Sequence, residues 1–228
     1  MIRIALPFSL ILSGIAWAEP LPLRIVAANL TSDNAQSYSP DNGNHSNPEG
    51  AGARILKALK PDIVMIQEFN TAGPTRQWVN QTLGENYQFM QEKGMQIPNG
   101  IISRFPIAES GSWDDPVLNN REFAWAHLRL PEKRDLWVVS VHLHSKGESS
   151  RATQAAALAK FIAEKVPKDA LLLVGGDLNT RSTGESCFKE TGGMGCFTKK
   201  AQRYRLCCGC NGGRDGRSTS GASAVLYR

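Results

Sequence analysis

The chain has 228 residues, of which 41% are hydrophobic and 21% are charged; this is the composition of a globular protein, and it excludes a membrane protein built from several apolar spans. After removal of a leader it is long enough for one domain with a sizeable core. A formal net charge of +5 and a pI of about 9.0 favour anionic partners such as nucleic acid, phosphates or an anionic membrane surface. The positive charge is scattered and becomes dense only near the C-terminus.

A secretion signal is predicted at the N-terminus. Arg3 precedes an almost unbroken apolar run from Ile4 to Ile15, and residues 16–18 (Ala-Trp-Ala) have the small-x-small form of a signal-peptidase site. A membrane anchor needs about twenty apolar residues, and this run is too short for one. We therefore expect cleavage near Ala18 and export to the periplasm or the medium, as a monomer without a stable membrane anchor.

The first two predicted strands each end in polar side chains. The strand over residues 23–28 is followed by Asn29, and the apolar strand over residues 62–66 is followed by Gln67 and Glu68. Between them a helix is predicted to start at Asn47, with Pro48 at its first position, and to end before residue 61. An unpaired buried carboxylate is costly, so Glu68 is expected to have a partner.

The middle of the chain predicts a helix over residues 75–83, a short strand near 87–90, and a strand over 99–107 that runs into a proline-marked turn. Arg104, in the latter segment, is a candidate phosphate contact, although a surface arginine is an equally good interpretation. In residues 122–130 aromatic side chains alternate with aliphatic ones, and this period of two indicates a strand. His127 within it is expected to be structural.

Two histidines follow the next predicted strand, over residues 136–141. His142 and His144 share one face, and an imidazole near a phosphoryl centre can act as a general acid or an orienting donor. A pair of exposed strand-end histidines is the competing interpretation. Ser149 or Ser150 then caps a long predicted helix, with Arg151 in its first turn.

The segment 174–180 (Val-Gly-Gly-Asp-Leu-Asn-Thr) follows an apolar strand that begins at residue 170. The two glycines are expected to turn the backbone where Asp177 and Asn179 emerge on the same side. Such a pair can hold a water, a divalent cation or a phosphate oxygen, although the same residues also favour a plain β-turn. Four apolar strands thus end in polar groups in the same chain sense, which favours a site over separate turns.

In these segments the sequence resembles the endonuclease/exonuclease/phosphatase family, which includes deoxyribonuclease I. The matching segments are residues 25–29, 61–68, 100–107, 139–146 and 175–179. The resemblance implies an α/β protein, a four-layer sandwich of two packed sheets flanked by helices, with the site across the strand ends. It also implies Mg²⁺-assisted (or Mn²⁺-assisted) in-line hydrolysis of a phosphodiester.

Roles for individual residues follow from the same resemblance. Glu68 is implied as the metal ligand and Asn29 as a second contributor to the metal and phosphate site. His142 is implied as the histidine on the scissile phosphate, Asp177 as the group that positions the attacking water, and Asn179 as a donor to a phosphate oxygen. In this comparison His144 is the less favoured histidine, because the family form is His-Leu-x-Ser; it stays a candidate for substrate binding, as does Arg104.

The C-terminal part departs from the family pattern. Members close with a Ser-Asp-His whose histidine serves as general base, and this chain has no histidine after His144. From about residue 190 the sequence is rich in Gly, Cys and Arg, which is compatible with a loop-rich extension, a truncated domain or a shifted reading frame; we favour the last two, and hence a fold incomplete at the C-terminus. A Cys187–Cys196 disulfide is compatible with export, and a zinc site at Cys207–Cys210 is disfavoured by its spacing.

The expected organisation is a signal peptide (1–18), a family domain (19–189) and an atypical tail (190–228). Two classes of function remain open. The first is an exported phosphodiesterase, in the first place a nuclease, with a phosphatase or a sphingomyelinase-like lipid hydrolase as the alternative. The second is a non-catalytic scaffold that keeps the site without turnover.

Overall fold

The computed structural model describes residues 21–30, 50–71, 73–181, 185–187 and 223–226. The predicted signal peptide, the predicted helix start at Asn47, Cys196 and the cluster Cys207–Cys210 lie outside the described residues. Among the helices that are described, none is both long and apolar enough to cross a bilayer.

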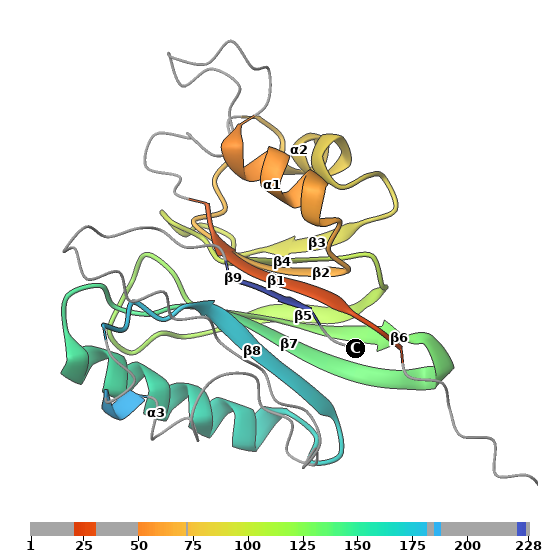
Figure 1. Cartoon of the computed structure of the whole chain (residues 1–228). Coiled ribbons are helices and arrows are strands. Elements are labelled where there is room, and N and C mark those ends of the chain that lie inside the picture. Colours follow the sequence, from red (N-terminus) through yellow and green to blue (C-terminus); the bar gives the residue numbers. More distant parts are fainter. Residues whose placement is uncertain (1–20, 31–49, 72, 182–184, 188–222, 227–228) are drawn as a thin grey trace, which may run out of the picture.

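Two β-sheets form the centre of the molecule (Figure 1). The first sheet has the order β3-β4-β2-β1-β9, with β1 (Arg24–Asn29), β2 (Ile63–Gln67), β3 (Gln88–Gln91), β4 (Gly100–Ser103) and β9 (Ser223–Leu226). The second sheet has the order β5-β6-β7-β8, with β5 (Ile107–Trp113), β6 (Phe123–Leu130), β7 (Arg134–His142) and β8 (Leu171–Asp177).

Helices cover the outer faces of both sheets. The helices α1 (Ala51–Leu59) and α2 (Thr75–Thr82) lie on the first sheet, and α3 (Glu148–Lys165) lies along the second, while a 3-10 turn (Pro131–Lys133) joins β6 to β7 (Figure 1). Three buried apolar clusters fill the interfaces between successive layers. The fold is therefore the predicted four-layer α/β sandwich.

Strand alternation decides which residues face the space between the sheets. In β2, Ile63 and Met65 pack in the inter-sheet cluster, whereas Val64 packs toward the helices. In β7, Val138 packs between the sheets and Val139 packs toward α3. Continued to the strand ends, the same alternation carries polar residues to the end of the inter-sheet core, namely Asn29, Gln67, Ser140, His142 and Asp177.

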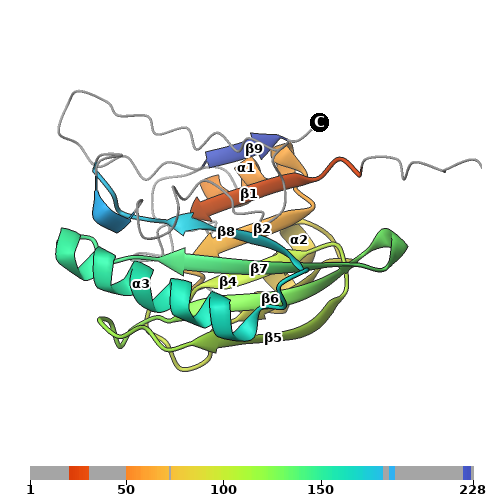
Figure 2. The ribbon, with the colours of Figure 1, turned by 90° about the horizontal axis from the view of Figure 1, so that it is seen from below.

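Parallel pairing brings the polar strand ends together. β1 and β2 are parallel with Asn29 opposite Gln67, and β7 and β8 are parallel with His142 opposite Asp177. Figure 2 shows the four strands running side by side in the two layers. Their C-terminal ends therefore define one edge of the sandwich.

Several boundaries differ from the predictions. The segment predicted as one strand to residue 107 divides into β4 and β5, and the polar middle of β5 concealed its strand character. Helix α3 begins after Gly147, ahead of the predicted serine caps. Strand β8 runs straight through both glycines to Asp177, so the predicted sharp turn there is wrong. β9, in the tail, pairs antiparallel with β1 and was not anticipated, since four residues are too few for a periodic signal.

The two glycines of β8 allow a close approach of neighbouring chains. A Cβ at Gly175 would lie 2.6 Å from the Met65 Cε of the facing sheet. At Gly176, whose φ is +147°, a Cβ would lie 1.9 Å from the carbonyl oxygen of Val141 in the adjacent strand. Gly176 therefore requires glycine both for steric reasons and for its backbone conformation, whereas a side chain at Gly175 would only displace the flexible end of Met65.

We predict that Gly176→Ala lowers the free energy of unfolding by about 3 kcal/mol, because the methyl group must displace β7 or β8 and strain the backbone. Gly73→Ala is the matched control, since nothing lies within 4 Å of a Cβ there. The control should change stability by less than about 0.5 kcal/mol. Urea unfolding measures both, and equal stabilities for the two variants would contradict the steric account.

Candidate functional site

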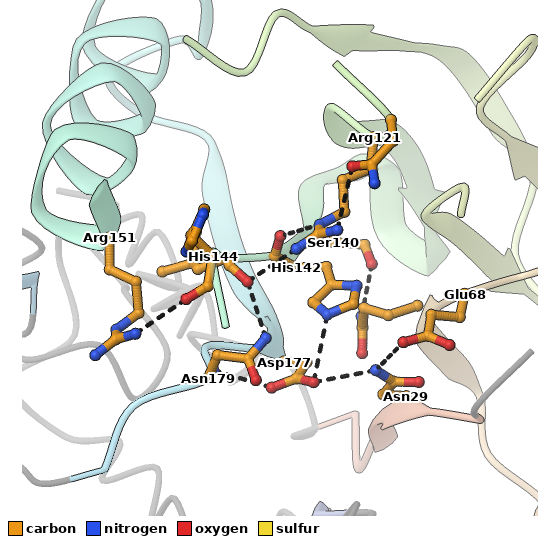
Figure 3. A network of polar contacts seen from close by, with 12 residues as sticks. Asn29, Glu68, Arg121, Ser140, His142, His144, Arg151, Asp177 and Asn179 are labelled. Atoms are coloured by element: carbon orange, nitrogen blue, oxygen red, sulfur yellow. Dashed lines mark hydrogen bonds and ion pairs between the residues drawn. The ribbon is translucent and has the colours of Figure 1, made fainter. Parts of the chain in front are cut away.

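One side-chain amide joins the two sheets at the strand ends (Figure 3). Nδ2 of Asn29, on β1, donates hydrogen bonds to Oε1 of Glu68 and to Oδ2 of Asp177, both at 3.0 Å. The bond to Asp177 crosses from the first sheet to the second. Two carboxylates are thus gathered around one amide NH₂ group.

Left-handed backbone conformations occur at two of these positions. Glu68 has φ +53° and Asn179 has φ +49°, values that non-glycine residues adopt rarely and at some cost in energy. Glu68 directly follows β2, and its conformation breaks the strand alternation so that its carboxylate can meet Asn29. Two of the four described non-glycine residues with positive φ thus lie where the polar groups converge, and backbone strain of this kind often clusters at functional sites.

Asp177 and Asn179 form a closed set of contacts with the end of β7. Oδ1 of Asp177 accepts a hydrogen bond from the Asn179 backbone N–H at 2.9 Å, and the Asn179 side-chain amide donates to the Leu143 carbonyl at 2.8 Å. The Leu143 N–H in turn donates to the Asp177 carbonyl at 2.9 Å. The loop after β8 is therefore fixed in place by hydrogen bonds.

His142 is a buried, neutral imidazole beside this set. Burial, together with the nearby Arg121 guanidinium, lowers the pKa of His142 to about 4, although Asp177 opposes the shift. Its Nε2 lies 3.6 Å from Oδ2 of Asp177, which is too long for a hydrogen bond. At neutral pH the contact is therefore not an ion pair, and the imidazole can serve as a neutral hydrogen-bond donor.

Arg121 is a functional candidate that sequence analysis missed. Its buried guanidinium donates from Nε to the His142 carbonyl at 2.6 Å and from an Nη to the Leu143 carbonyl at 3.1 Å. Burial lowers the pKa of Arg121, but nearby carboxylates oppose that effect and the group stays charged. The site thus holds a positive charge behind His142. The only feature of the sequence that could have indicated this role is the position of an arginine at the start of an apolar strand.

Glu92 was also missed, and it organises the loop that carries Arg121. Its carboxylate accepts hydrogen bonds from the Asn99 N–H at 2.7 Å and from the Glu122 N–H at 3.2 Å. Burial is the main cause that raises the pKa of Glu92 to about 7. This side chain ties the end of β3 to the segments that precede β4 and β6.

The remaining predicted residues lie apart from this group. Nδ1 of His144 accepts hydrogen bonds from the Lys146 and Gly147 N–H groups at 3.1 and 3.2 Å, so its ring holds the loop that directly follows it. Arg104 pairs with Asp62 at 2.7 Å, next to the start of β2, because β4 runs antiparallel to β2 and ends opposite Ile63. The structure therefore does not bring either residue to Asp177.

Two further residues have structural contacts. His127 stacks on Trp137 with ring centroids 5.3 Å apart, as a structural histidine would. Arg151 forms a buried ion pair with Glu185 at 2.6 Å and donates to the His144 carbonyl at 3.0 Å. Cys187, a neighbour of Glu185, is a buried thiol.

The oxygen atoms at the site suit a hard divalent cation. Within the described residues no group of three or more His, Cys, Asp or Glu side chains is arranged around a metal position. Mg²⁺ needs fewer protein ligands, since it keeps several waters and is held by one or two carboxylates plus substrate phosphate. The Glu68 carboxylate fits that pattern, with the Asn29 side chain in contact with it.

Comparison with known proteins places the chain among phosphoester-processing folds. Residues 42–221 match the model of the endonuclease/exonuclease/phosphatase family. No curated protein sequence matches the chain.

Solved structures share the fold at low identity. D. rerio TDP2 complexed with single strand DNA product is 22% identical with a TM-score of 0.58, over 76% of this chain and 66% of that one. An endonuclease/exonuclease/phosphatase from Bacteroides vulgatus is 17% identical with a TM-score of 0.59, over 75% and 70%. A β-hairpin deletion mutant of beta toxin from Staphylococcus aureus is 16% identical with a TM-score of 0.53, over 74% and 72%. At these identities the likeness shows the fold alone.

The buried Glu92 predicts a pH-dependent stability. Because its pKa is raised in the folded chain from an ordinary 4.5 to about 7, its contribution is fully present below pH 4.5 and is lost as the pH rises through 7. Relative to Glu92→Gln, the wild type should lose about 3 kcal/mol of unfolding free energy between pH 4 and pH 8. Urea unfolding across that range is the measurement. Replacing the exposed Glu109 by Gln is the control, and a pH-independent difference between wild type and Glu92→Gln would refute the assignment.

Proposed function

The chain belongs to the endonuclease/exonuclease/phosphatase family, and from this we propose that it is a divalent-metal-dependent phosphodiester hydrolase with a nuclease-type site and a slow hydrolytic step. The observation that carries the proposal is the Asn29 amide between the Glu68 and Asp177 carboxylates. It gathers metal-binding oxygens from both sheets beside a neutral imidazole and a buried guanidinium.

The proposed metal is Mg²⁺ or Mn²⁺, with Glu68 and the Asn29 amide oxygen as its protein ligands. When bound, such an ion stabilises negative charge that develops on the phosphoryl group. Asp177 orients the attacking water through its carboxylate, while His142 and Asn179 donate to phosphate oxygens. Arg121 supports this set from behind, because its charge favours an anion in front of His142.

The slow step follows from the weak basicity of the imidazole beside Asp177. Among the described residues that imidazole belongs to His142, whose pKa burial lowers to about 4, so it accepts a proton from water poorly; the sequence has no histidine after His144. A carboxylate acting alone holds the proton of water poorly at neutral pH. The absence of a positioned general base typically costs about 10² to 10⁴ in rate.

Nucleic acid is the substrate class we propose. The net charge of +5 favours a polyanion. The D. rerio TDP2 structure, which shares the fold, contains a single strand DNA product.

Export of the chain is a further proposal, supported by the N-terminal pattern that ends at Ala18. The mature protein recovered from the periplasm or the medium should begin at Glu19. Intact-mass analysis is the test, and an exported chain that retains Met1 would contradict cleavage.

Metal binding and hydrolysis are tested together. Calorimetric titration with Mn²⁺ should show binding by the wild type and a loss of at least tenfold in affinity for Glu68→Gln, because one charged oxygen ligand is removed. The exposed variant Glu109→Gln is the control and should bind as the wild type does.

Hydrolysis is followed on supercoiled plasmid and on bis-p-nitrophenyl phosphate with Mg²⁺. We expect little or no turnover, with any residual activity abolished by Asp177→Ala. Equal Mn²⁺ affinity in wild type and Glu68→Gln would remove Glu68 from the site. Robust turnover that depends on Asp177 would show that the C-terminal segment supplies the missing base.

A further inference from the structure

A buried hydrogen bond connects the two sheets directly behind the site. Nε2 of Gln67, the last residue of β2, donates to Oγ of Ser140 in β7 at 2.8 Å. The Ser140 hydroxyl in turn donates to the Ile66 carbonyl at 3.2 Å. Both side chains are fully buried, with 0% exposure. We call this pair the inter-sheet tie.

The tie lies at the boundary between the apolar core and the polar site. The neighbours of Gln67 and Ser140 on the inward faces of their strands, Met65 and Val138, belong to the apolar inter-sheet cluster. Immediately beyond the tie come Glu68 on one sheet and His142 on the other. An apolar contact has no preferred separation or direction, whereas a hydrogen bond has both.

The glycines of β8 make room for the tie. A Cβ at Gly176 would lie 2.9 Å from Nε2 of Gln67, so a side chain there would displace the amide. At the same level, Gly175 faces Met65 closely. The close approach of the sheets and the polar contact between them are therefore parts of one arrangement.

We propose that Gln67 and Ser140 are positioning residues that set the spacing between the two halves of the site. Asn29 ends β1 and Glu68 directly follows β2 on the side of the first sheet. His142 and Asp177 end strands of the second sheet, and Asn179 lies in the loop after β8. The Asn29–Asp177 bond is the site's own contact across that gap. The part of the proposal that concerns metal binding rests on the proposed function, whereas the part that concerns spacing does not.

The test removes the tie without leaving the Gln67 amide or the Ser140 hydroxyl unsatisfied. Ser140→Ala alone strands the Gln67 amide, which destabilises the fold for a purely local reason. Gln67→Met with Ser140→Ala replaces both partners by apolar groups of similar shape, and such paired replacements can be nearly neutral in stability. The matched control is Gln81→Met with Ser110→Ala, two exposed positions.

Two readouts are compared in full-length protein. The midpoint of urea unfolding reports stability, and the side-chain amide resonances of Asn29 in a ¹⁵N-correlated NMR spectrum, identified by their loss in Asn29→Ala, report the contacts with Glu68 and Asp177. We expect the double variant to recover the midpoint that Ser140→Ala loses, and its Asn29 amide protons to shift toward those of exposed asparagines. In the control variant both readouts should match the wild type.

Unshifted Asn29 resonances in the double variant would overturn the proposal, whatever its midpoint of urea unfolding. Shifted resonances with a midpoint as low as that of Ser140→Ala would also overturn it, because they would mark general loosening. If the double variant does not fold, the Asn29 resonances of Ser140→Ala are compared with those of the wild type at urea concentrations below its unfolding midpoint. Unshifted Asn29 resonances in that variant would again overturn the proposal.

Mn²⁺ titration separates this proposal from the proposed function. With the tie removed, the dissociation constant should rise at least tenfold. If no variant, including the wild type, binds Mn²⁺ while the Asn29 resonances shift as expected, the metal assignment fails and the positioning role stands. If the wild type and the double variant bind Mn²⁺ equally, the tie does not position the metal ligands.

Discussion

The separation of the two sheets at their strand ends is the constraint on which the site depends. Asn29 reaches Asp177 across that gap with a hydrogen bond of 3.0 Å, and a contact of this kind tolerates only a few tenths of an ångström of displacement. Gly176 in β8 permits the approach, because a Cβ there would collide with the Val141 carbonyl oxygen of the neighbouring strand and meet Nε2 of Gln67 from the facing sheet. Packing of small and large residues between the sheets therefore decides whether the polar groups meet at all.

The electrostatics of the site follow from burial as much as from contacts. A positive guanidinium under the end of β7 holds two successive backbone carbonyls. Burial, and after it this guanidinium, lowers the pKa of His142 and keeps it neutral, while the carboxylates of Glu68 and Asp177 stay partly accessible on the open side. The resulting arrangement is positive behind and negative in front. A cation bound to the carboxylates and an anion held by donors can occupy adjacent positions in such a field, which is the combination that a metal-bound phosphodiester requires.

Local pattern was enough to predict the strand ends, because buried parallel strands give continuous apolar runs and place their C-terminal residues along one edge. The four layers were implied by the resemblance to the family. Asn29, Glu68, His142, Asp177 and Asn179 could be found in this way. Arg121 and Glu92 could not, since their roles arise from burial between segments far apart in the chain and no periodicity signals that burial. The inward direction of Ser140 was available from alternation, but its partner Gln67 lies in the other sheet, and only the packed structure brings them together.

The central claim is that these strand ends form one cation site rather than separate polar turns. The most direct measurement is paramagnetic broadening by Mn²⁺ of backbone amide resonances in ¹⁵N-labelled protein. Our account predicts that substoichiometric Mn²⁺ broadens the amides of Asn29, Glu68 and Asp177 together and spares those around Arg104, at the opposite end of β2. Broadening centred elsewhere, or confined to only one of the two sheets, would contradict a shared site at the strand ends.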